Sequence, residues 1–261
     1  MGEPLVSCLM VTAGRMQLAE RAVRCFCAQT WKQRELVIVD DGNDDYAPML
    51  RRYSGTATIQ YHRISPDPAC RRFLGGLRNI SLDCARGDYC AQWDDDDWYH
   101  PDRLEVQMGA IARGFDAAVL RHTLMHLDTA KYVEHPFRTG LRRGTPGTIV
   151  HRRSTLRYPD QRKREDTVYL DRLRKAQRVA ILGPEFSHLF VRCFHGDNTW
   201  DRKHFSGRLH YSLRNKLDYL WARFVRHDVL THPSFRLTAR EAESARLFLA
   251  ESRELGLVGR G

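Results

Sequence analysis

The chain has 261 residues, a net charge of +10 and a hydrophobic share of 42%. This length and apolar content suit one large domain, or one domain with an appendage, built around a real hydrophobic core. No apolar run reaches about eighteen residues, which excludes a transmembrane helix, and the first residues lack the basic and apolar regions of a secretory signal. We therefore expect a cytoplasmic protein.

The positive charge is unevenly distributed. Residues 138–178 hold thirteen Lys or Arg against four Asp or Glu, a local charge of +9, and residues 201–261 hold twelve against seven, a local charge of +5. Such basic regions suit a phosphate-bearing partner: a nucleotide diphosphate, an anionic membrane surface or a nucleic acid. A solvated arginine-rich surface is the alternative. The seven cysteines form no C-x-x-C pair, so we expect reduced core thiols and no zinc cluster.

The N-terminal segment predicts a strand–helix–strand unit. Residues 4–11 form an apolar run of strand length, residues 16–29 carry a helical apolar face, and residues 36–39 form a second buried strand. In open α/β sheets, ligands bind at the carboxyl ends of the strands. Asp40 and Asp41 stand at such an end, although a plain turn would explain them too.

The rest of the chain continues the α/β pattern. The arginine-rich segments 138–143 and 157–164 contain or adjoin glycine and proline and are predicted to be loops. The predicted strands are 59–64, 117–120, 148–151, 179–182 and 189–194. The predicted helices are 48–53, 75–87 (opened by glycines and closed by Gly87), one with Pro101 in its first turn, and one that begins at Glu165.

Four consecutive carboxylates, Asp94 to Asp97, follow an apolar run and are flanked by Trp93 and Trp98. Adjacent carboxylates repel one another unless a cation or solvent compensates their charge. Oxygen ligands at a strand end suit Mg²⁺ or Mn²⁺, whereas a solvated acidic loop is the simpler explanation. For Asp97, capping of the helix at Pro101 is a further role.

The pattern changes after about residue 205. Residues 210–226 predict a helix that mixes arginine with Tyr, Trp and Phe, and Thr238 with Glu241 forms a capping box that opens a last helix. The aromatic residues of 210–226 suit packing against the core, which we favour, or peripheral contact at the inner membrane face. We divide the chain into a main domain, 1–204, and a helical extension, 205–261.

The ordered set of motifs resembles family 2 glycosyltransferases of the GT-A fold. The resemblance covers residues 4–200 and implies a Rossmann-like, mostly parallel α/β sheet flanked by helices, with a helical C-terminal appendage. It also implies that the main domain has a nucleotide-sugar-binding half, 1–110, and an acceptor-binding half, 111–204. The matching pieces are residues 6–12 with Arg15, Gln29-Thr30-Trp31, 35–42, Gly76-Leu77-Arg78-Asn79, 85–89, Asp94 to Asp97 with Pro101 and Leu104, Glu165-Asp166, and His195-Gly196-x-Asn198.

The resemblance implies how a nucleotide-diphosphate sugar, most simply a UDP-sugar, would be held. Asp41 would accept hydrogen bonds from the base or ribose, with Asp40 beside it, and Thr12 and Arg15 would line the same pocket. Arg78 would reach the base or the diphosphate.

The acidic run would supply the metal site. Asp94-x-Asp96 corresponds to the family's D-x-D motif: Asp96 would ligate Mn²⁺ or Mg²⁺, and Asp94 would hold the ribose or sugar or join the metal. Asp95 would neighbour the sugar or phosphate, and His195 would approach the metal or diphosphate. The fourth charge leaves the ligand's identity open among Asp94, Asp96 and Asp97.

The resemblance also implies the reaction. Asp166 would act as general base on a hydroxyl acceptor (a glycan, a lipid-linked glycan or a metabolite), and a single in-line attack would invert the anomeric carbon. Capping of its helix is the alternative for Asp166. The first turn, residues 12–15, lacks the aromatic that many relatives stack on the base.

Three other functions remain open from the sequence. One is a glycosyltransferase that acts on a modified DNA base, although no base-flipping signature is visible. Another is a non-catalytic nucleotide-sugar-binding module with a basic surface, against which the costly set of carboxylates argues. A nucleotidyltransferase would need a glycine- and lysine-rich phosphate loop near the N-terminus, which the sequence lacks.

Overall fold

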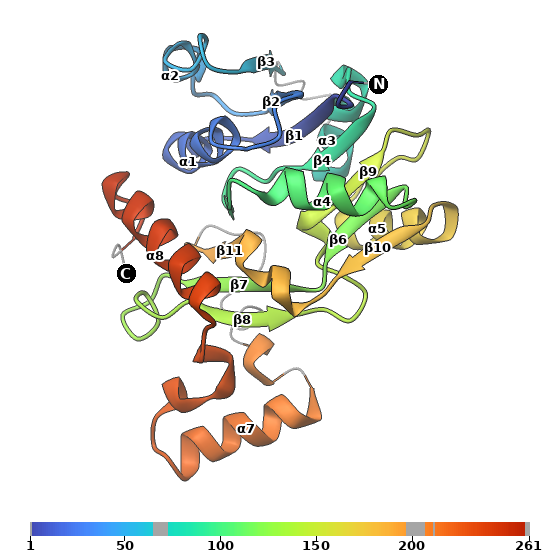
Figure 1. Ribbon diagram of the computed structural model, residues 1–261. Helices are drawn as coiled ribbons and strands as arrows, with labels where there is room; N and C mark the ends of the chain where they lie inside the picture. Colours follow the sequence, from blue (N-terminus) through green and yellow to red (C-terminus); the bar gives the residue numbers. More distant parts are fainter. Residues whose placement is uncertain (1, 65–72, 197–206, 211, 259–261) are drawn as a thin grey trace.

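A computed structural model describes residues 2–64, 73–196, 207–210 and 212–258. Its main element is a seven-stranded, mostly parallel sheet, in which only β9 runs antiparallel to its neighbours (Figure 1). A mostly parallel sheet flanked by helices confirms the predicted α/β class. In sheet order its strands are β10 (Val179–Leu182), β6 (Ala117–Leu120), β9 (Val150–Arg152), β4 (Tyr89–Gln92), β1 (Val6–Thr12), β2 (Arg34–Asp40) and β3 (Thr58–Arg63).

The register of this sheet brings the acidic motifs to one edge. Thr12, the last residue of β1, pairs with Asp40, the last residue of β2. On its other side β1 runs parallel to β4, and Leu9 pairs with Gln92, the last residue of β4. The chain therefore leaves β1, β2 and β4 at the same carboxyl edge, where ligands of such sheets bind.

Helices cover the sheet because each has one apolar stripe. The α-helices in the described residues up to 196 are α1 (Met16–Cys27), α2 (Ala47–Arg51), α3 (Leu74–Cys84), α4 (Arg103–Ala112) and α5 (Glu165–Ala176). In α1 the residues Leu18, Ala22, Val23 and Phe26 are buried, as the periodicity predicts. The cysteines that the structure describes are all free. The predicted core position is confirmed for Cys8, Cys25, Cys90 and Cys193, whereas Cys27 and Cys84 are only partly buried.

The predicted end of α3 at Gly87 is wrong. The helix ends at Cys84, and Ala85 already has an extended backbone. Gly87 serves a different purpose, because a β-carbon there would lie 2.7 Å from the carbonyl oxygen of Leu5 and the hydroxyl of Ser7. Glycine at this position allows the chain to enter β4 close to β1.

A second sheet, which the sequence analysis did not predict as such, lies beside the first (Figure 1). The prediction of a loop over 138–143 is partly wrong, because Phe137–Gly140 is a strand. Phe137 is buried, and the charge of Arg138 is paired with Glu241 of the last helix. In sheet order the strands are β5 (Trp98–Tyr99), β11 (Phe190–Phe194), β7 (His122–Leu127) and β8 (Phe137–Gly140).

The last helix, α8 (Ala239–Glu254), packs into the main core. Phe248 and Leu249 belong to the same buried cluster as β1 and β2, and Glu251 accepts a 2.8 Å hydrogen bond from the indole of Trp98. The predicted capping box of Thr238 and Glu241 is present. The boundary placed at residue 205 stays a prediction.

The other C-terminal helix, α7 (Leu213–Phe224), projects from the far end of the molecule (Figure 1). The expectation that its aromatics pack against the core is wrong for Trp221 and Phe224, whose side chains are 59% and 62% exposed. Only Ala222 of this helix is buried. No helix in the described parts of the chain is long and apolar enough to cross a bilayer.

Candidate active site

The turns after β1 and β2 touch one another at the carboxyl edge. A β-carbon on Gly42 would lie 2.7 Å from the backbone nitrogen of Gly14, so only glycine allows this approach. Asp40 is fully buried beneath the turn, where its carboxylate accepts hydrogen bonds from the Gly42 N–H at 2.8 Å and the Tyr61 hydroxyl at 2.7 Å. Asp41, by contrast, is half-buried and faces a pocket described below.

The four aspartates after β4 turn to different partners. Asp95 is buried and accepts hydrogen bonds from the Thr12 hydroxyl at 2.7 Å and the Arg15 guanidinium at 2.6 Å. Burial raises the pKa of Asp95 to about 6, although Arg15 opposes this shift. Asp97 is also buried and accepts a 3.0 Å hydrogen bond from the backbone N–H of Cys193. The suggested capping role of Asp97 is wrong, because α4 begins at Arg103 and its N-cap residue is Asp102. The Asp97 carboxylate instead holds the backbone of β11.

Asp96 lies between a guanidinium and an imidazole. Its Oδ2 atom is 3.2 Å from Nη1 of Arg15 and 3.4 Å from Nε2 of His195. Burial acts to raise the pKa of Asp96, but the hydrogen bond from His195 and the charge of Arg15 outweigh burial and hold this pKa below its usual range. His195, predicted from a distant motif, thus reaches the acidic run, whereas Asn198 of the same motif lies outside the described residues.

Arg78, on α3, connects the acidic run to α5. Its Nη2 atom donates to Asp94 at 2.8 Å and its Nε atom donates to Glu165 at 3.3 Å. Its guanidinium also lies over the ring of Tyr158, 5.8 Å from the ring centre. Burial acts to lower the pKa of Arg78, but the surrounding carboxylates raise it well above its ordinary value, so the cation is retained.

The first turn of α5 carries the predicted Glu–Asp pair. Glu165 is buried against Arg78, whereas Asp166 is half-buried. Oδ1 of Asp166 accepts a 2.6 Å hydrogen bond from the backbone N–H of Thr167; within the described part of the chain, no hydrogen bond engages its Oδ2 atom. Arg164, which precedes the helix, has a left-handed backbone with φ of 66°. Such a conformation is strained for a non-glycine residue and suggests a constrained site.

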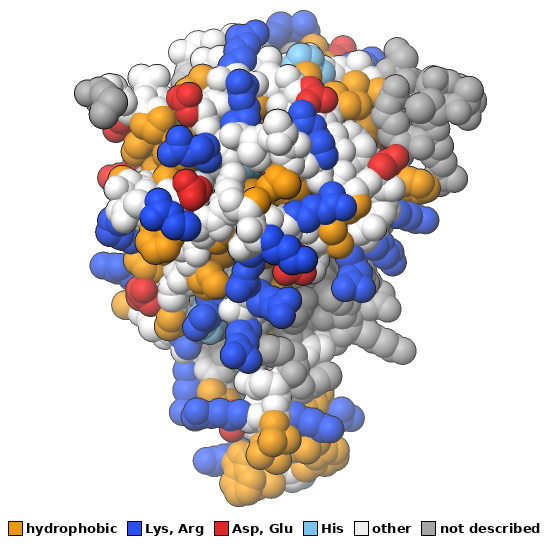
Figure 2. Space-filling view, turned by 90° about the vertical axis from the view of Figure 1, so that its right-hand side faces the viewer, with side chains coloured by type: hydrophobic (Ala, Val, Ile, Leu, Met, Phe, Trp, Pro, Cys, Tyr) orange, Lys and Arg blue, Asp and Glu red, His pale blue; other side chains and the backbone are white. Residues whose placement is uncertain are grey.

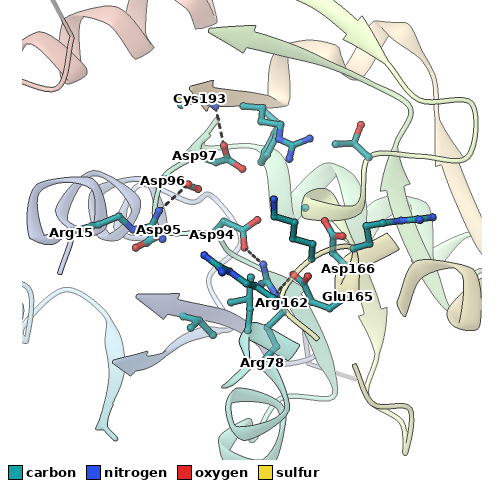
Figure 3. A pocket seen from close by; sticks show the side chains of 18 residues that line it. Arg15, Arg78, Asp94, Asp95, Asp96, Asp97, Arg162, Glu165, Asp166 and Cys193 are labelled. Carbon is teal, nitrogen blue, oxygen red and sulfur yellow. Dashed lines mark hydrogen bonds and ion pairs between the residues drawn. The ribbon is translucent and has the colours of Figure 1, made fainter. Parts of the chain in front are cut away.

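These side chains line one hollow, which we call the central pocket. Figure 3 shows Asp94 to Asp97 on one side of it and Glu165 with Asp166 on the other. Several lining residues, such as Phe190 and Arg192, were not predicted, because their segments show no motif. The lining consists of Val11, Arg15, Leu74, Arg78, Asp94, Asp95, Asp96, Asp97, Thr145, Gly147, Arg162, Lys163, Arg164, Glu165, Asp166, Phe190, Arg192 and Cys193.

A second hollow, the side pocket, adjoins the central pocket and shares Val11, Arg15, Leu74 and Arg162 with it. The rest of its lining is Thr12, Ala13, Asp41, Phe73 and Leu77. Three residues predicted for the nucleotide, Thr12, Arg15 and Asp41, therefore do meet, and Asp40 lies outside both linings. Phe73, just before α3, supplies an aromatic ring that the sequence analysis did not find in the first turn.

The donor set at Asp96 fits a divalent cation. A partly exposed carboxylate oxygen and an imidazole nitrogen 3.4 Å apart are ligand types that Mn²⁺ accepts. Among the described residues, however, no three His, Cys, Asp or Glu side chains gather as a metal site. The carboxylate of Asp94 instead forms an ion pair with Arg78, and the carboxylate of Asp95 forms an ion pair with Arg15.

Comparison with known proteins gives the same family as the motifs. The family "Glycosyl transferase family 2" matches residues 7–171, which is more than half of the chain. The chain is 35% identical over 116 residues to the succinoglycan biosynthesis protein ExoO of Rhizobium meliloti, covering 41% of this chain and 30% of that protein. It is 29% identical over 133 residues to the uncharacterized glycosyltransferase RC0461 of Rickettsia conorii, covering 49% and 21%.

Solved structures share the fold at low sequence identity. The chain is similar to TarS residues 1–349 of S. aureus, solved with UDP-GlcNAc, with a TM-score of 0.59, 17% identity, and coverage of 96% of this chain and 73% of that chain. It is also similar to the mannosyltransferase PcManGT of Pyrobaculum calidifontis, solved with GDP-Man and Mn²⁺, with a TM-score of 0.54, 15% identity, and coverage of 98% and 77%. The match of motifs, family and fold shows that the chain belongs to glycosyl transferase family 2 and has the GT-A fold.

Proposed function

We propose that the chain transfers a sugar from a nucleotide-diphosphate sugar to a hydroxyl group. The observation that carries this proposal is the position of Asp166, which faces the acidic run across the central pocket (Figure 3). A carboxylate opposite a cation-binding edge suits a reaction in which the leaving group becomes negative while the acceptor loses a proton.

The side pocket would hold the nucleoside. Asp41 offers a carboxylate to the base or ribose, and Phe73, which is 39% exposed, offers a ring face against which a base can stack. Because the two pockets share Arg15 and Arg162, the diphosphate would lie between them, beside these cations. The solved structures of relatives that hold UDP-GlcNAc and GDP-Man support a nucleotide sugar as donor.

Asp96 and His195 would bind Mn²⁺ or Mg²⁺, with Asp94 as a further ligand. The bound cation would neutralise the charge of the departing diphosphate. The Mn²⁺ in the PcManGT structure supports this assignment. Arg15 already holds Asp95 and Asp96 in place, so the acidic edge is oriented before any ligand binds.

Asp166 would accept the proton of the attacking hydroxyl through Oδ2. Its Oδ1 atom is fixed by the Thr167 N–H, and Glu165, its neighbour, is neutralised by Arg78. With Asp166 as the proposed base, the reaction would be a single displacement, which inverts the anomeric carbon. The acceptor is proposed to be a glycan, lipid-linked glycan or metabolite hydroxyl.

Nucleotide binding tests this assignment directly. We expect calorimetric titration with UDP or GDP in the presence of Mn²⁺ to show binding, and Asp41→Asn to weaken it by about tenfold, the loss of roughly one charged hydrogen bond. Asp44→Asn, an exposed aspartate three residues further on, is the matched control. Equal affinities for both variants would place the nucleoside elsewhere.

A further inference from the structure

The helix α7 exposes a continuous apolar stripe. Five of its residues and the residue that follows the helix are between 38% and 78% exposed: Leu213, Leu217, Leu220, Trp221, Phe224 and Val225. Their spacing of three and four residues places them on one side of the helix at about 100° per residue. Figure 2 shows hydrophobic side chains gathered at this end of the molecule. A contiguous apolar surface of this kind marks an interaction site.

The opposite side of α7 is attached to the protein. Ala222 is buried, and Tyr219 packs with the cluster that contains Leu209, Val229 and Phe235. Ser212 caps the helix by accepting a 3.1 Å hydrogen bond from the Asn215 N–H. The stripe is therefore held outward by a formed helix.

Cationic side chains border the stripe. Arg214 lies at one edge of it, and Lys216 and Arg223 lie along the other, all of them exposed. Residues 213–226 hold four Lys or Arg and one Asp, a local charge of +3. An exposed Trp and Phe framed by Lys and Arg match the chemistry of the boundary between lipid headgroups and acyl chains.

We propose that α7 docks this protein on an anionic lipid bilayer, with the helix lying in the plane of the membrane. Its 12 residues span about 18 Å, too short to cross a hydrocarbon core of about 30 Å. A second copy of the chain fits the stripe less well, because a symmetric contact would bring one +3 helix against another. Anionic headgroups would instead neutralise the cationic border. This proposal concerns α7 alone and does not depend on the transfer reaction.

Co-sedimentation with lipid vesicles tests the proposal. The wild-type protein is expected to bind vesicles of phosphatidylcholine mixed with phosphatidylglycerol, and to bind pure phosphatidylcholine vesicles more than about tenfold more weakly. The double variant Trp221→Ser, Phe224→Ser is expected to lose more than about tenfold in affinity for the mixed vesicles. Phe115→Ser, which removes an exposed aromatic elsewhere, should bind as wild type.

Two results would overturn the membrane assignment. One is equal binding of the wild-type protein and the double variant to mixed vesicles, or no binding by either, with both proteins folded by circular dichroism. The other is a wild-type dimer in light scattering that the double variant converts to a monomer, with no vesicle binding; the stripe would then be a subunit interface.

Discussion

A guanidinium nitrogen of Arg78 lies 2.8 Å from a carboxylate oxygen of Asp94. The same guanidinium donates a second hydrogen bond to Glu165, the residue before Asp166. One buried cation thus connects the acidic run after β4 to the helix that carries the proposed base. Arg78 therefore fixes the positions of the two sides of the central pocket relative to one another.

Replacing Arg78 tests this connection through stability. Arg78→Met leaves the buried Glu165 and the largely buried Asp94 without their cation, and should lower the free energy of unfolding by about 3–5 kcal/mol. Urea denaturation measures this loss. Arg86→Met, at an exposed position two residues after α3, is the matched control. Similar unfolding midpoints for the two variants would show that Arg78 does not hold the pocket together.

His195→Ala tests the proposed metal ligand. With one ligand removed, the Mn²⁺ concentration that gives half-maximal activity should rise by at least about tenfold. The comparison is an activity titration with Mn²⁺ for both proteins. His135→Ala, which alters an exposed histidine on another loop, should titrate as wild type. An unchanged Mn²⁺ requirement in His195→Ala would assign His195 to a structural role at Asp96.

Phe73→Ser tests base stacking in the side pocket. Removing one stacking ring costs roughly 1–3 kcal/mol, so the affinity for the nucleotide should fall by about fivefold to 150-fold. Phe115 has the same exposed fraction, 39%, and lies outside both pockets, so Phe115→Ser is the control. Nucleotide affinity is read by calorimetry. If the two serine variants bind alike, the base does not stack on Phe73.

The lowered pKa of Glu241 predicts how the free energy of unfolding depends on pH. Burial acts to raise its pKa, but hydrogen bonds from Arg138, Ser187 and Thr238 outweigh burial and lower the pKa of Glu241 from 4.5 to about 2. Because the folded pKa is the lower one, the stabilisation is complete above about pH 4.5 and is lost as the pH falls toward 2.

The variant Glu241→Gln should therefore be less stable than wild type at pH 7, by about 2 kcal/mol, and this difference should shrink below pH 4.5. Urea midpoints of both proteins between pH 7 and pH 3 measure the difference. Glu243→Gln, on the exposed side of the same helix, should match wild type throughout. A stability difference that stays constant with pH would contradict the assigned ionisation of Glu241.

The elements with strong local patterns were predictable from sequence. The strands that became β1, β2 and β4 are apolar runs, and acidic turns follow β2 and β4. Because α1 also has a clear apolar stripe, the edge of the sheet with Asp41 and Asp94 to Asp97 could be predicted. The strand β8 could not, because Arg138 and Gly140 suggest a loop, and the partner of Arg138 is Glu241, 103 residues away.

Individual roles within the acidic motifs also depend on distant contacts. Asp40 and Asp41 are adjacent and chemically alike, yet Tyr61, 21 residues away, engages Asp40 beneath the turn. Asp97 is fixed by Cys193, 96 residues further along the chain. The exposure of Trp221 and Phe224 likewise depends on which elements reach α7, and an amphipathic pattern alone does not specify this.

The most direct test of the proposed transfer reaction is nucleotide release from a panel of nucleotide sugars, with Mn²⁺ or with EDTA, for wild type and Asp166→Asn. The wild-type protein should release nucleotide from at least one donor when Mn²⁺ is present. An acceptor should increase the rate of this release, and EDTA should abolish the release. Asp166→Asn should lower the rate by about 10²–10⁴-fold with nearly unchanged donor affinity. Asp171→Asn, on the same helix outside the pocket, should keep full activity. No metal-dependent release from any donor, or an active Asp166→Asn, would contradict the account.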